Sequence, residues 1–254
     1  MLTIDLSGKR ALVTGASGQL GRTMAKTLAQ CGADVAVHYF HNEAQAQKVS
    51  REIQAMGRKS VAVQADFASE ESVYAMRDLL AGGFGLPDIV VNNAVSQYRW
   101  TTVLQQDSAD YLDQFRSCVM QNVLMAKAFA PHMVAQKYGR IVAVNTECAI
   151  ECFPTQSAYA SAKRGQDGVL RCLARELGPS GVTVNQVAPG WTISEREREN
   201  GLDDMTHYLP QVPLGRRGTD QEIANAVAFL CSDLASFITG AFLPVCGGKA
   251  MTAI

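Results

Sequence analysis

The sequence lacks any apolar run approaching the roughly 18 residues that a membrane-spanning helix needs. It also lacks an excess of either charge, since 23 basic and 24 acidic residues leave a net charge of -1. No positively charged start is followed by an apolar stretch, so we expect no signal peptide. This balance predicts neither a nucleic-acid nor a membrane partner.

Regular cysteine spacing is absent as well. The seven cysteines are odd in number and scattered along the chain. Their number and scatter do not indicate a disulfide framework. The pair His38 and His41 does not indicate a metal site either, because no other histidine or cysteine lies near it in the sequence. We therefore expect a reducing, cytoplasmic location and no bound metal ion.

What the chain does contain is a regular alternation of short β-branched runs and longer helical patterns. Continuous apolar strands alternating with helices are typical of a parallel sheet covered on both faces. The 254 residues, without an internal repeat or linker, predict one domain spanning 1–254 with a doubly wound, Rossmann-like α/β fold. The predicted strands are 11–14, 34–39, 60–64, 88–92, 140–144, 183–187 and 242–245, and the predicted helices are 20–31, 43–56, 70–81, 108–137, 157–177 and 220–232.

The least regular segment is 191–215, which contains the alternating charges of 195–199. A charge run of this kind is usually a solvated face. Its position between the sixth strand and the last helix also suits a substrate lid.

A glycine-rich loop follows the first predicted strand and opens the first predicted helix. Its glycines would let the backbone turn tightly and approach a pyrophosphate resting on the helix N-terminus. Such a loop can also be an ordinary strand-to-helix turn, but this position favours a dinucleotide site. The residues of the predicted site are Gly15, Ser17, Gly18, Gln19, Leu20 and Gly21.

The end of the second predicted strand bears on the choice of cofactor. NAD-binding folds usually place an acid there to hold the ribose 2′-hydroxyl. Here Tyr39 occupies the position, and the polar groups nearby are His38, His41 and Asn42. Imidazoles that carry charge near neutral pH suit a 2′-phosphate, so the sequence favours NADP(H) over NAD(H). The alternative is that His38 packs in the sheet and His41 is a surface residue.

Tyr159 and Lys163 stand four residues apart in a predicted helix and so share one face. An ammonium group one turn away would lower the phenol pKa from about 10. The pair would then exchange protons near neutral pH. An ordinary surface pair on an amphipathic helix is the alternative.

Together these motifs resemble the short-chain dehydrogenase/reductase family over essentially the whole chain. Further segments that carry the resemblance are 66–67, 92–95, 185–192 and 238–248. The resemblance implies a catalytic tetrad of Asn122, Thr146, Tyr159 and Lys163, with Thr146 in place of the family's serine. It also implies cofactor contacts from Asp66, Phe67, Asn93, Ala94, Val95, Tyr159, Lys163, Pro189, Gly190 and Thr192.

The family chemistry implies hydride transfer between a nicotinamide and a small-molecule carbonyl or alcohol. Tyr159 would protonate the developing alkoxide while Lys163 holds the nicotinamide ribose. Thr146 would hydrogen-bond the same substrate oxygen, because it keeps a hydroxyl although its methyl group restricts χ1. Glu147 is the other candidate for this role.

Two other functions remain open at this point. The loop without a middle glycine and the His-Tyr pair after the second strand are similar to pteridine reductases, which implies possible reduction of a C=N bond. A non-catalytic NADP-sensing protein could use the same fold, although the presence of Tyr159 and Lys163 favours an enzyme.

Aromatic and polar residues near the tetrad indicate a ring-bearing or polyhydroxylated substrate. They are Gln97, Tyr98, Trp100, Glu147, Phe153 and Trp191. We also expect a homotetramer or homodimer. The family resemblance implies one, and we assign several apolar residues, among them Leu124 and Phe129, to the outer faces of the helices.

Overall fold

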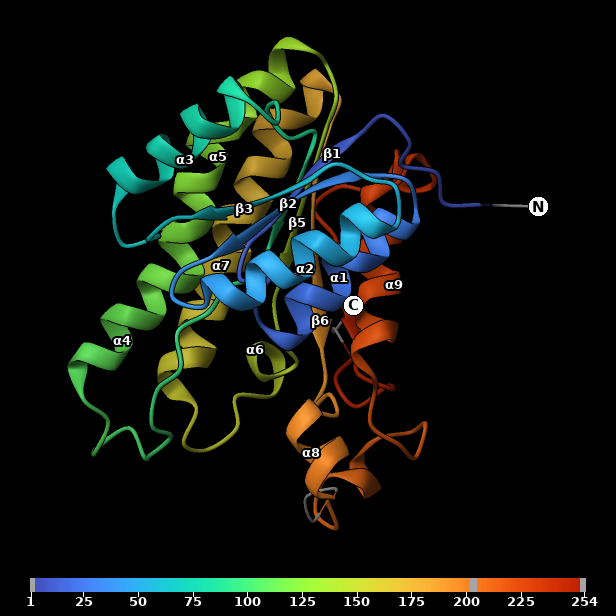
Figure 1. The fold of residues 1–254 in the computed structure, drawn as a ribbon. Helices are drawn as coiled ribbons and strands as arrows, with labels where there is room; N and C mark the ends of the chain where they lie inside the picture. The colour runs from blue at the N-terminus through green and yellow to red at the C-terminus, as the bar shows by residue number, and fades with distance from the viewer. Residues whose placement is uncertain (1–2, 202–204, 252–254) are drawn as a thin grey trace.

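The computed structural model describes residues 3–201 and 205–251. Its centre is a seven-stranded parallel sheet in the order β3-β2-β1-β4-β5-β6-β7 (Figure 1). This confirms the predicted fold class, and every predicted strand is present with ends displaced by no more than about two residues. The strands are β1 (Arg10–Val13), β2 (Asp34–Tyr39), β3 (Ser60–Gln64), β4 (Ile89–Asn92), β5 (Gly139–Val144), β6 (Val182–Pro189) and β7 (Phe242–Val245).

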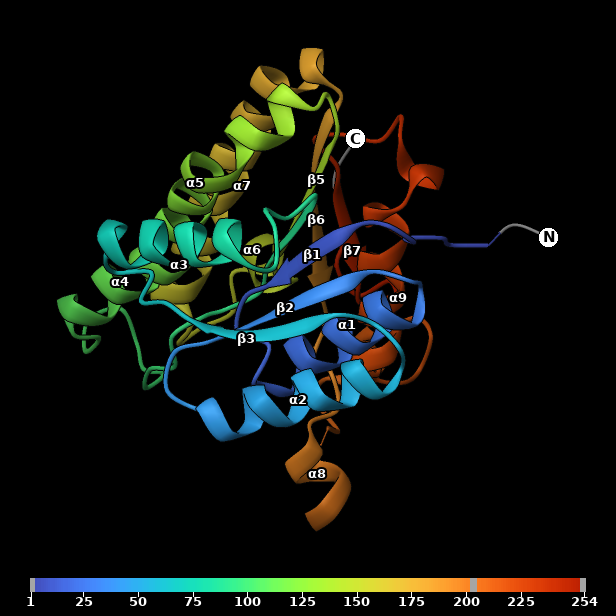
Figure 2. The same ribbon diagram turned by 45° about the horizontal axis from the view of Figure 1, so that its top comes forward.

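Helices cover both faces of the sheet. Figure 2 shows α1, α2 and α9 on one side and α3, α5 and α7 on the other. None of the helices in the described residues is long and apolar enough to cross a membrane. The helices are α1 (Gln19–Gln30), α2 (Glu43–Ala55), α3 (Glu70–Gly82), α4 (Ser108–Phe115), α5 (Gln121–Ala135), α6 (Cys148–Glu151), α7 (Ser157–Leu177), α8 (Glu195–Asn200) and α9 (Asp220–Cys231).

The strands are apolar on both sides because each side faces a separate hydrophobic cluster. Leu12 lies beside Ala36 and Val90 in the parallel register, and all three belong to the cluster beneath α3, α5 and α7. The next residue, Val13, points to the opposite cluster beneath α1, α2 and α9. This alternation follows from the two-residue period of a strand.

The order of the strands places the site. After β3 at one edge, the chain crosses back to form β4 on the other side of β1. The carboxyl ends of β1 and β4 therefore flank the point where the winding direction reverses, and ligands of open parallel sheets bind at this crevice.

The predicted helix 108–137 is interrupted. The structure has α4, a π-helical turn at Arg116–Met120, and then α5. The side-chain amide of Asn122 donates to the Cys118 carbonyl oxygen at 2.6 Å, within this turn. Single π-helical turns inside α-helices frequently mark functional sites, and the apolar pattern gave no sign of one here.

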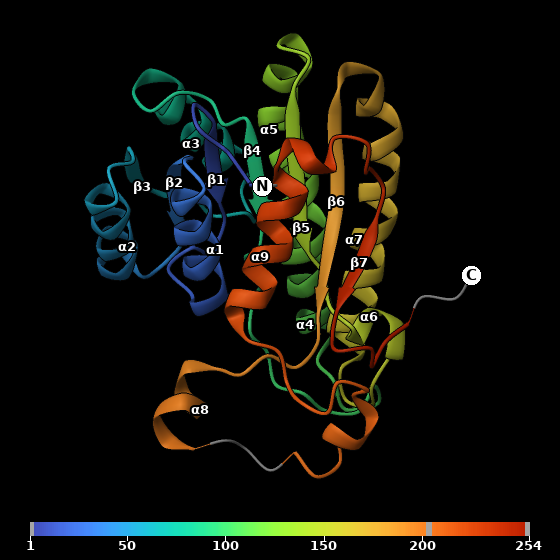
Figure 3. The ribbon, with the colours of Figure 1, turned by 90° about the vertical axis from the view of Figure 1, so that its right-hand side faces the viewer.

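The segment 191–215 contains the short helix α8, which we did not predict. Ser194 and Glu197 form a capping box at its start. Figure 3 shows α8 beyond the carboxyl ends of the strands, away from both helical layers. The interpretation of this charge run as a solvated face is wrong for Glu197, which is buried.

The apolar residues that we assigned to an outer surface are not all there. Leu124 and Phe129 are buried and pack in the hydrophobic cluster beneath α3, α5 and α7. They are unavailable for contact between subunits, because a helix of this layer turns its apolar stripe toward the sheet. The burial of these two residues removes one of the arguments for the predicted homotetramer or homodimer.

Candidate active site

Two cavities meet at the carboxyl ends of the strands. The larger has a volume of about 990 Å³ and extends over the glycine loop, whereas the smaller, of about 470 Å³, lies beside residues 190–192 and 207–211. Tyr159 and Thr146 line both cavities. A molecule in one cavity can therefore approach a molecule in the other beside these two side chains.

The floor of the larger cavity requires glycine. A Cβ atom at Gly21 would lie 2.7 Å from the side-chain amide nitrogen of Asn93 and closer still to the Gly15 carbonyl oxygen. Gly15 itself has a φ of 62°, a conformation that side chains disfavour. Helix α1 can therefore approach the loop closely and present its N-terminal amides to the cavity.

Thr14 joins the two strands at the reversal point. Its hydroxyl oxygen accepts from the backbone amides of Asn93 and Ala94 at 2.8 and 3.0 Å, and it donates to the Gln121 side chain at 2.7 Å. Gln121 in turn donates to the Ala94 carbonyl oxygen. Neither Thr14 nor Gln121 is among the predicted site residues.

Lys163 is buried and held by the protein. Its ammonium group donates to the Val144 carbonyl oxygen at 2.5 Å and to the Gln166 side-chain oxygen at 3.0 Å. It lies 5.8 Å from the centre of the Tyr159 ring. Burial lowers the pKa of Lys163.

The expected lowering of the tyrosine pKa by Lys163 is wrong for this structure. Burial raises the pKa of Tyr159, because the charged phenolate loses hydration. A hydrogen bond with Thr146 acts in the opposite direction but is the smaller effect. The phenol is consequently held in its protonated form.

Asn122 differs from the other three predicted catalytic residues. Thr146, Tyr159 and Lys163 line the larger cavity, but Asn122 does not. It is buried behind the cavity, where its side-chain oxygen accepts from Asn92 at 2.7 Å. Its side chain therefore orders the ends of β4 and α5.

The predicted cofactor residues gather around the larger cavity, except Tyr39. The Tyr39 side chain is buried in the hydrophobic cluster beneath α1, α2 and α9, so its assignment to the site is wrong. The cavity is also lined by Phe40, Arg116 and Ser117, which were not predicted. Predicted residues that line it are Gly15, Ser17, Gly18, Gln19, Leu20, Gly21, His38, His41, Asn42, Asp66, Phe67, Asn93, Ala94, Val95, Tyr159, Lys163, Pro189, Gly190 and Thr192.

His38 cannot supply the charge that we expected. Its Nδ1 accepts from the Gly15 amide at 3.0 Å, which leaves Nε2 to donate to the Ala65 carbonyl oxygen at 3.0 Å. Burial lowers the pKa of His38 to about 4. The alternative interpretation, a neutral histidine packed in the sheet, is correct, and His41 remains exposed at the cavity.

All six predicted substrate residues line the smaller cavity. The structure adds residues that were not predicted, most of which come from the segment after α8 and from the C-terminal end. The six are Gln97, Tyr98, Trp100, Glu147, Phe153 and Trp191, and the additions include Gln156, His207, Tyr208, Gln211 and Lys249.

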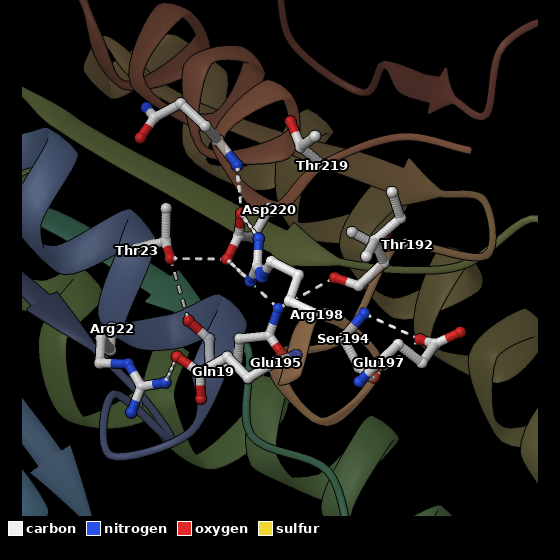
Figure 4. Close-up of polar contacts among 12 residues, drawn as sticks. Gln19, Arg22, Thr23, Thr192, Ser194, Glu195, Glu197, Arg198, Thr219 and Asp220 are labelled. Carbon is white, nitrogen blue, oxygen red and sulfur yellow. Dashed lines mark hydrogen bonds and ion pairs between the residues drawn. The ribbon is translucent and has the colours of Figure 1, made fainter. Parts of the chain in front are cut away.

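Residues of segment 191–215 bind the glycine loop and α9 (Figure 4). The Gln19 amide donates to the Ile193 carbonyl oxygen and to Asp220 at 3.1 and 3.2 Å, and its oxygen accepts from the Glu195 amide at 2.7 Å. Arg198 binds both oxygens of Asp220 at 3.1 and 2.7 Å. We call this set of contacts the latch.

A buried ion pair supports the same segment from within. Arg217 binds both carboxylate oxygens of Glu197, and both side chains are 3% exposed. Arg217 also donates to the carbonyl oxygens of Trp191 and Thr192 at 3.0 and 2.8 Å. These contacts hold the strand-to-α8 connection against the rest of the protein.

Comparison with known proteins agrees with this geometry. A family model described as Enoyl-(Acyl carrier protein) reductase matches residues 15–250. The 3-oxoacyl-[acyl-carrier-protein] reductase FabG of Staphylococcus aureus is 38% identical over 245 residues, which cover 96% of this chain and 98% of the relative. The chain belongs to the short-chain dehydrogenase/reductase family.

Other members of the family extend the comparison. FabG of Escherichia coli (strain K12) is also 38% identical, over 98% of this chain and 100% of the relative. The crystal structure of a gluconate 5-dehydrogenase from Burkholderia cenocepacia J2315, in complex with NADP and tartrate, is 28% identical with a TM-score of 0.90, and the match covers 98% of both chains. These matches support an oxidoreductase.

We expect His38 to make stability sensitive to acid. The unfolded chain protonates this residue near its ordinary pKa of 6.5, whereas the folded protein does so only near 4. The stability gained from the neutral form is thus complete above pH 6.5 and is lost as the pH falls to 4, by roughly 3 kcal/mol in total. Urea unfolding of wild type and His38→Gln at about pH 7.5 and pH 4.5 would measure the difference.

The exposed residue His41 provides the matched control. His41→Gln should lose as much stability on acidification as the wild type, whereas His38→Gln should lose clearly less. Equal losses in the wild type and His38→Gln would contradict the assignment.

Proposed function

We propose that this chain is an NADP(H)-dependent oxidoreductase that interconverts a carbonyl and an alcohol, with Tyr159 as general acid and base. The observation that carries the proposal is the position of Tyr159 and Thr146 where the two cavities meet. Relatives named for 3-oxoacyl and gluconate substrates support chemistry at a carbonyl or secondary alcohol carbon.

The residues of the larger cavity fit a dinucleotide. Gly15 and Gly21 leave a cradle that any side chain would fill, and the N-terminal end of α1 would hold the pyrophosphate. Asp66 and Phe67 would meet the adenine, and Lys163 would hold the nicotinamide ribose. The bound nicotinamide would supply the hydride.

The remaining chemistry belongs to the side chains at the junction. Because burial keeps the Tyr159 phenol protonated, it can give its proton to the substrate oxygen during reduction. The Thr146 hydroxyl would donate to the same oxygen and stabilise the developing negative charge.

Tyr159→Phe is expected to lower kcat by about 1000-fold, because the proton donor is removed while the ring still packs. Thr146→Ala should cost less, about 100-fold, and Thr146→Ser should remain active. The measurement is NADPH oxidation over ketones, sugars, quinones and pterins, together with the NADPH dissociation constant. Substantial activity in Tyr159→Phe would refute the assignment, and a fully active Thr146→Ala would transfer the threonine's role to Glu147.

The preference for NADP(H) is proposed to depend on His41. This side chain is exposed at the cavity, and Asn42 caps helix α2 beside it by accepting from the Gln45 amide at 3.1 Å. A 2′-phosphate placed here would meet the imidazole and the positive end of the helix. The gluconate 5-dehydrogenase structure that contains NADP supports the choice.

His41→Ala should therefore weaken NADPH binding by about tenfold, equivalent to 1.4 kcal/mol, and leave NADH binding nearly unchanged. Titration of both reduced cofactors by fluorescence would measure the two dissociation constants. A wild-type preference for NADH, or an NADPH affinity indifferent to His41, would contradict the proposal.

Segment 191–215, of which residues 202–204 lie outside the described residues, is proposed to act as a lid that encloses the cofactor. The latch supports this role, because Gln19, the first residue of α1, lines the larger cavity and also binds the segment that leads into α8. The Asp220 carboxylate completes the contact, and its hydrogen bonds with Arg198 lower its pKa to about 2. The latch consequently keeps its charges at neutral pH.

Loss of the latch should accelerate release of NADPH. Gln19→Ala and Arg198→Ala each remove hydrogen bonds worth about 1–2 kcal/mol, which predicts a dissociation rate constant increased by about tenfold. Displacement of NADPH by excess NADP⁺ in a stopped-flow instrument would measure the rate constant. Glu199→Gln, on the exposed face of α8, is the matched control, and equal rate constants in all four proteins would exclude a lid function for the latch.

A further inference from the structure

The smaller cavity is lined by two residues that each carry an unsatisfied acceptor. Oε2 of Glu147 and Oε1 of Gln156 are buried, and neither has a hydrogen-bond partner among the described residues. A buried polar atom without a partner costs about 1–3 kcal/mol. Two such atoms beside one cavity are explained if a ligand supplies their missing donors.

Glu147 is held rigidly in place. Its other carboxyl oxygen accepts from the Tyr208 hydroxyl at 2.8 Å, and that hydroxyl accepts from the Trp191 amide at 2.9 Å. Its own backbone amide donates to the Pro189 carbonyl oxygen at 2.9 Å. The residue is also 2% exposed, so its remaining oxygen needs a partner from within the protein or from within the cavity.

The charges around the cavity favour an uncharged ligand. The ammonium group of Lys249 is already engaged by Gln211 at 3.0 Å and by the Glu151 carboxylate at 3.5 Å. It also lies 4.7 Å from the centre of the Phe153 ring. A carboxylate ligand would therefore find the Lys249 ammonium already paired.

A hydroxyl group fits the two acceptors better than other donors. It can donate to Gln156, and it can satisfy Glu147 whether that acid is ionised or protonated, because a hydroxyl both donates and accepts. The partly exposed rings of Trp100 and Trp191 provide apolar walls for the C–H groups of the same molecule.

We propose that the substrate is an uncharged polyhydroxylated ketone or the corresponding polyol, and that Glu147 and Gln156 determine this specificity by binding hydroxyl groups away from the reacting carbon. The inference rests on the oxidoreductase function proposed above. In reduction, the ketone carbon gains a hydride from NADPH and its oxygen gains the Tyr159 proton, which yields a secondary alcohol and NADP⁺. Tyr159 then regains a proton from solvent.

Ligand binding can be measured without turnover. The chain has two tryptophans, Trp100 and Trp191, and both line this cavity, so intrinsic fluorescence reports on it directly. The titrants are xylitol, 1,5-pentanediol, which has the same chain length but lacks the inner hydroxyls, and xylonate, which carries a carboxylate. The wild type would be titrated without cofactor, and Tyr159→Phe with saturating NADP⁺.

Xylitol should bind at least about tenfold more tightly than either of the other two titrants. Glu147→Leu and Gln156→Leu should each weaken xylitol binding by about tenfold or more, whereas Glu147→Gln, which retains polar atoms, should weaken it less. Gln54→Leu, on the exposed face of α2, is the matched control. Thermal melting and the NADPH dissociation constant would establish that each variant is folded.

Equal binding of xylitol and pentanediol, tighter binding of xylonate, or xylitol binding unaffected by the two leucine variants would overturn the inference. Turnover separates this inference from the proposed function. NADPH oxidation with simple ketones but no preference for hydroxylated ones would refute the inference alone. Specific xylitol binding, without turnover of xylulose or any other carbonyl compound, would refute the oxidoreductase function. It would still support an uncharged polyhydroxylated compound as the ligand.

Discussion

The close approach of Gly21 to the Gly15 carbonyl and the Asn93 amide is the constraint on which the site depends. It lets α1 begin directly against the end of β1, so the helix amides face the cavity without intervening side chains. Thr14 fixes the neighbouring ends of β1 and β4 at the same point. The larger cavity extends from this corner to Tyr159, and Gln19, two residues before Gly21, makes the latch contacts.

Most of the architecture could be predicted from the sequence because it depends on local periodicity. The strand 34–39 and the helix 157–177 have the bounds that the apolar pattern indicates. The spacing of Ser194 and Glu197 would also have predicted the capping box of α8, although we considered only the run of charges. The π-helical turn before Asn122 could not be predicted, because one extra residue in a turn leaves no distinct pattern in a largely apolar helix.

The site was predictable in its position and less so in its electrostatics. The sequence pattern correctly placed Tyr159, Lys163 and His38 at the site, but such a pattern carries no information on burial. Burial reverses the expected direction of the pKa shift for Tyr159 and removes the expected charge from His38. Residues such as Tyr208 and Lys249 reach the smaller cavity from far along the chain, and only the tertiary structure brings them beside Glu147.

The separation in sequence between the two sides of the latch has a consequence for folding. Gln19 and Asp220 are 201 residues apart, and α1 shares its hydrophobic cluster with α9. During synthesis the N-terminal helix therefore lacks part of its apolar partner until nearly the entire chain has emerged from the ribosome. Such long-range pairing slows folding and leaves nascent apolar surface uncovered during synthesis.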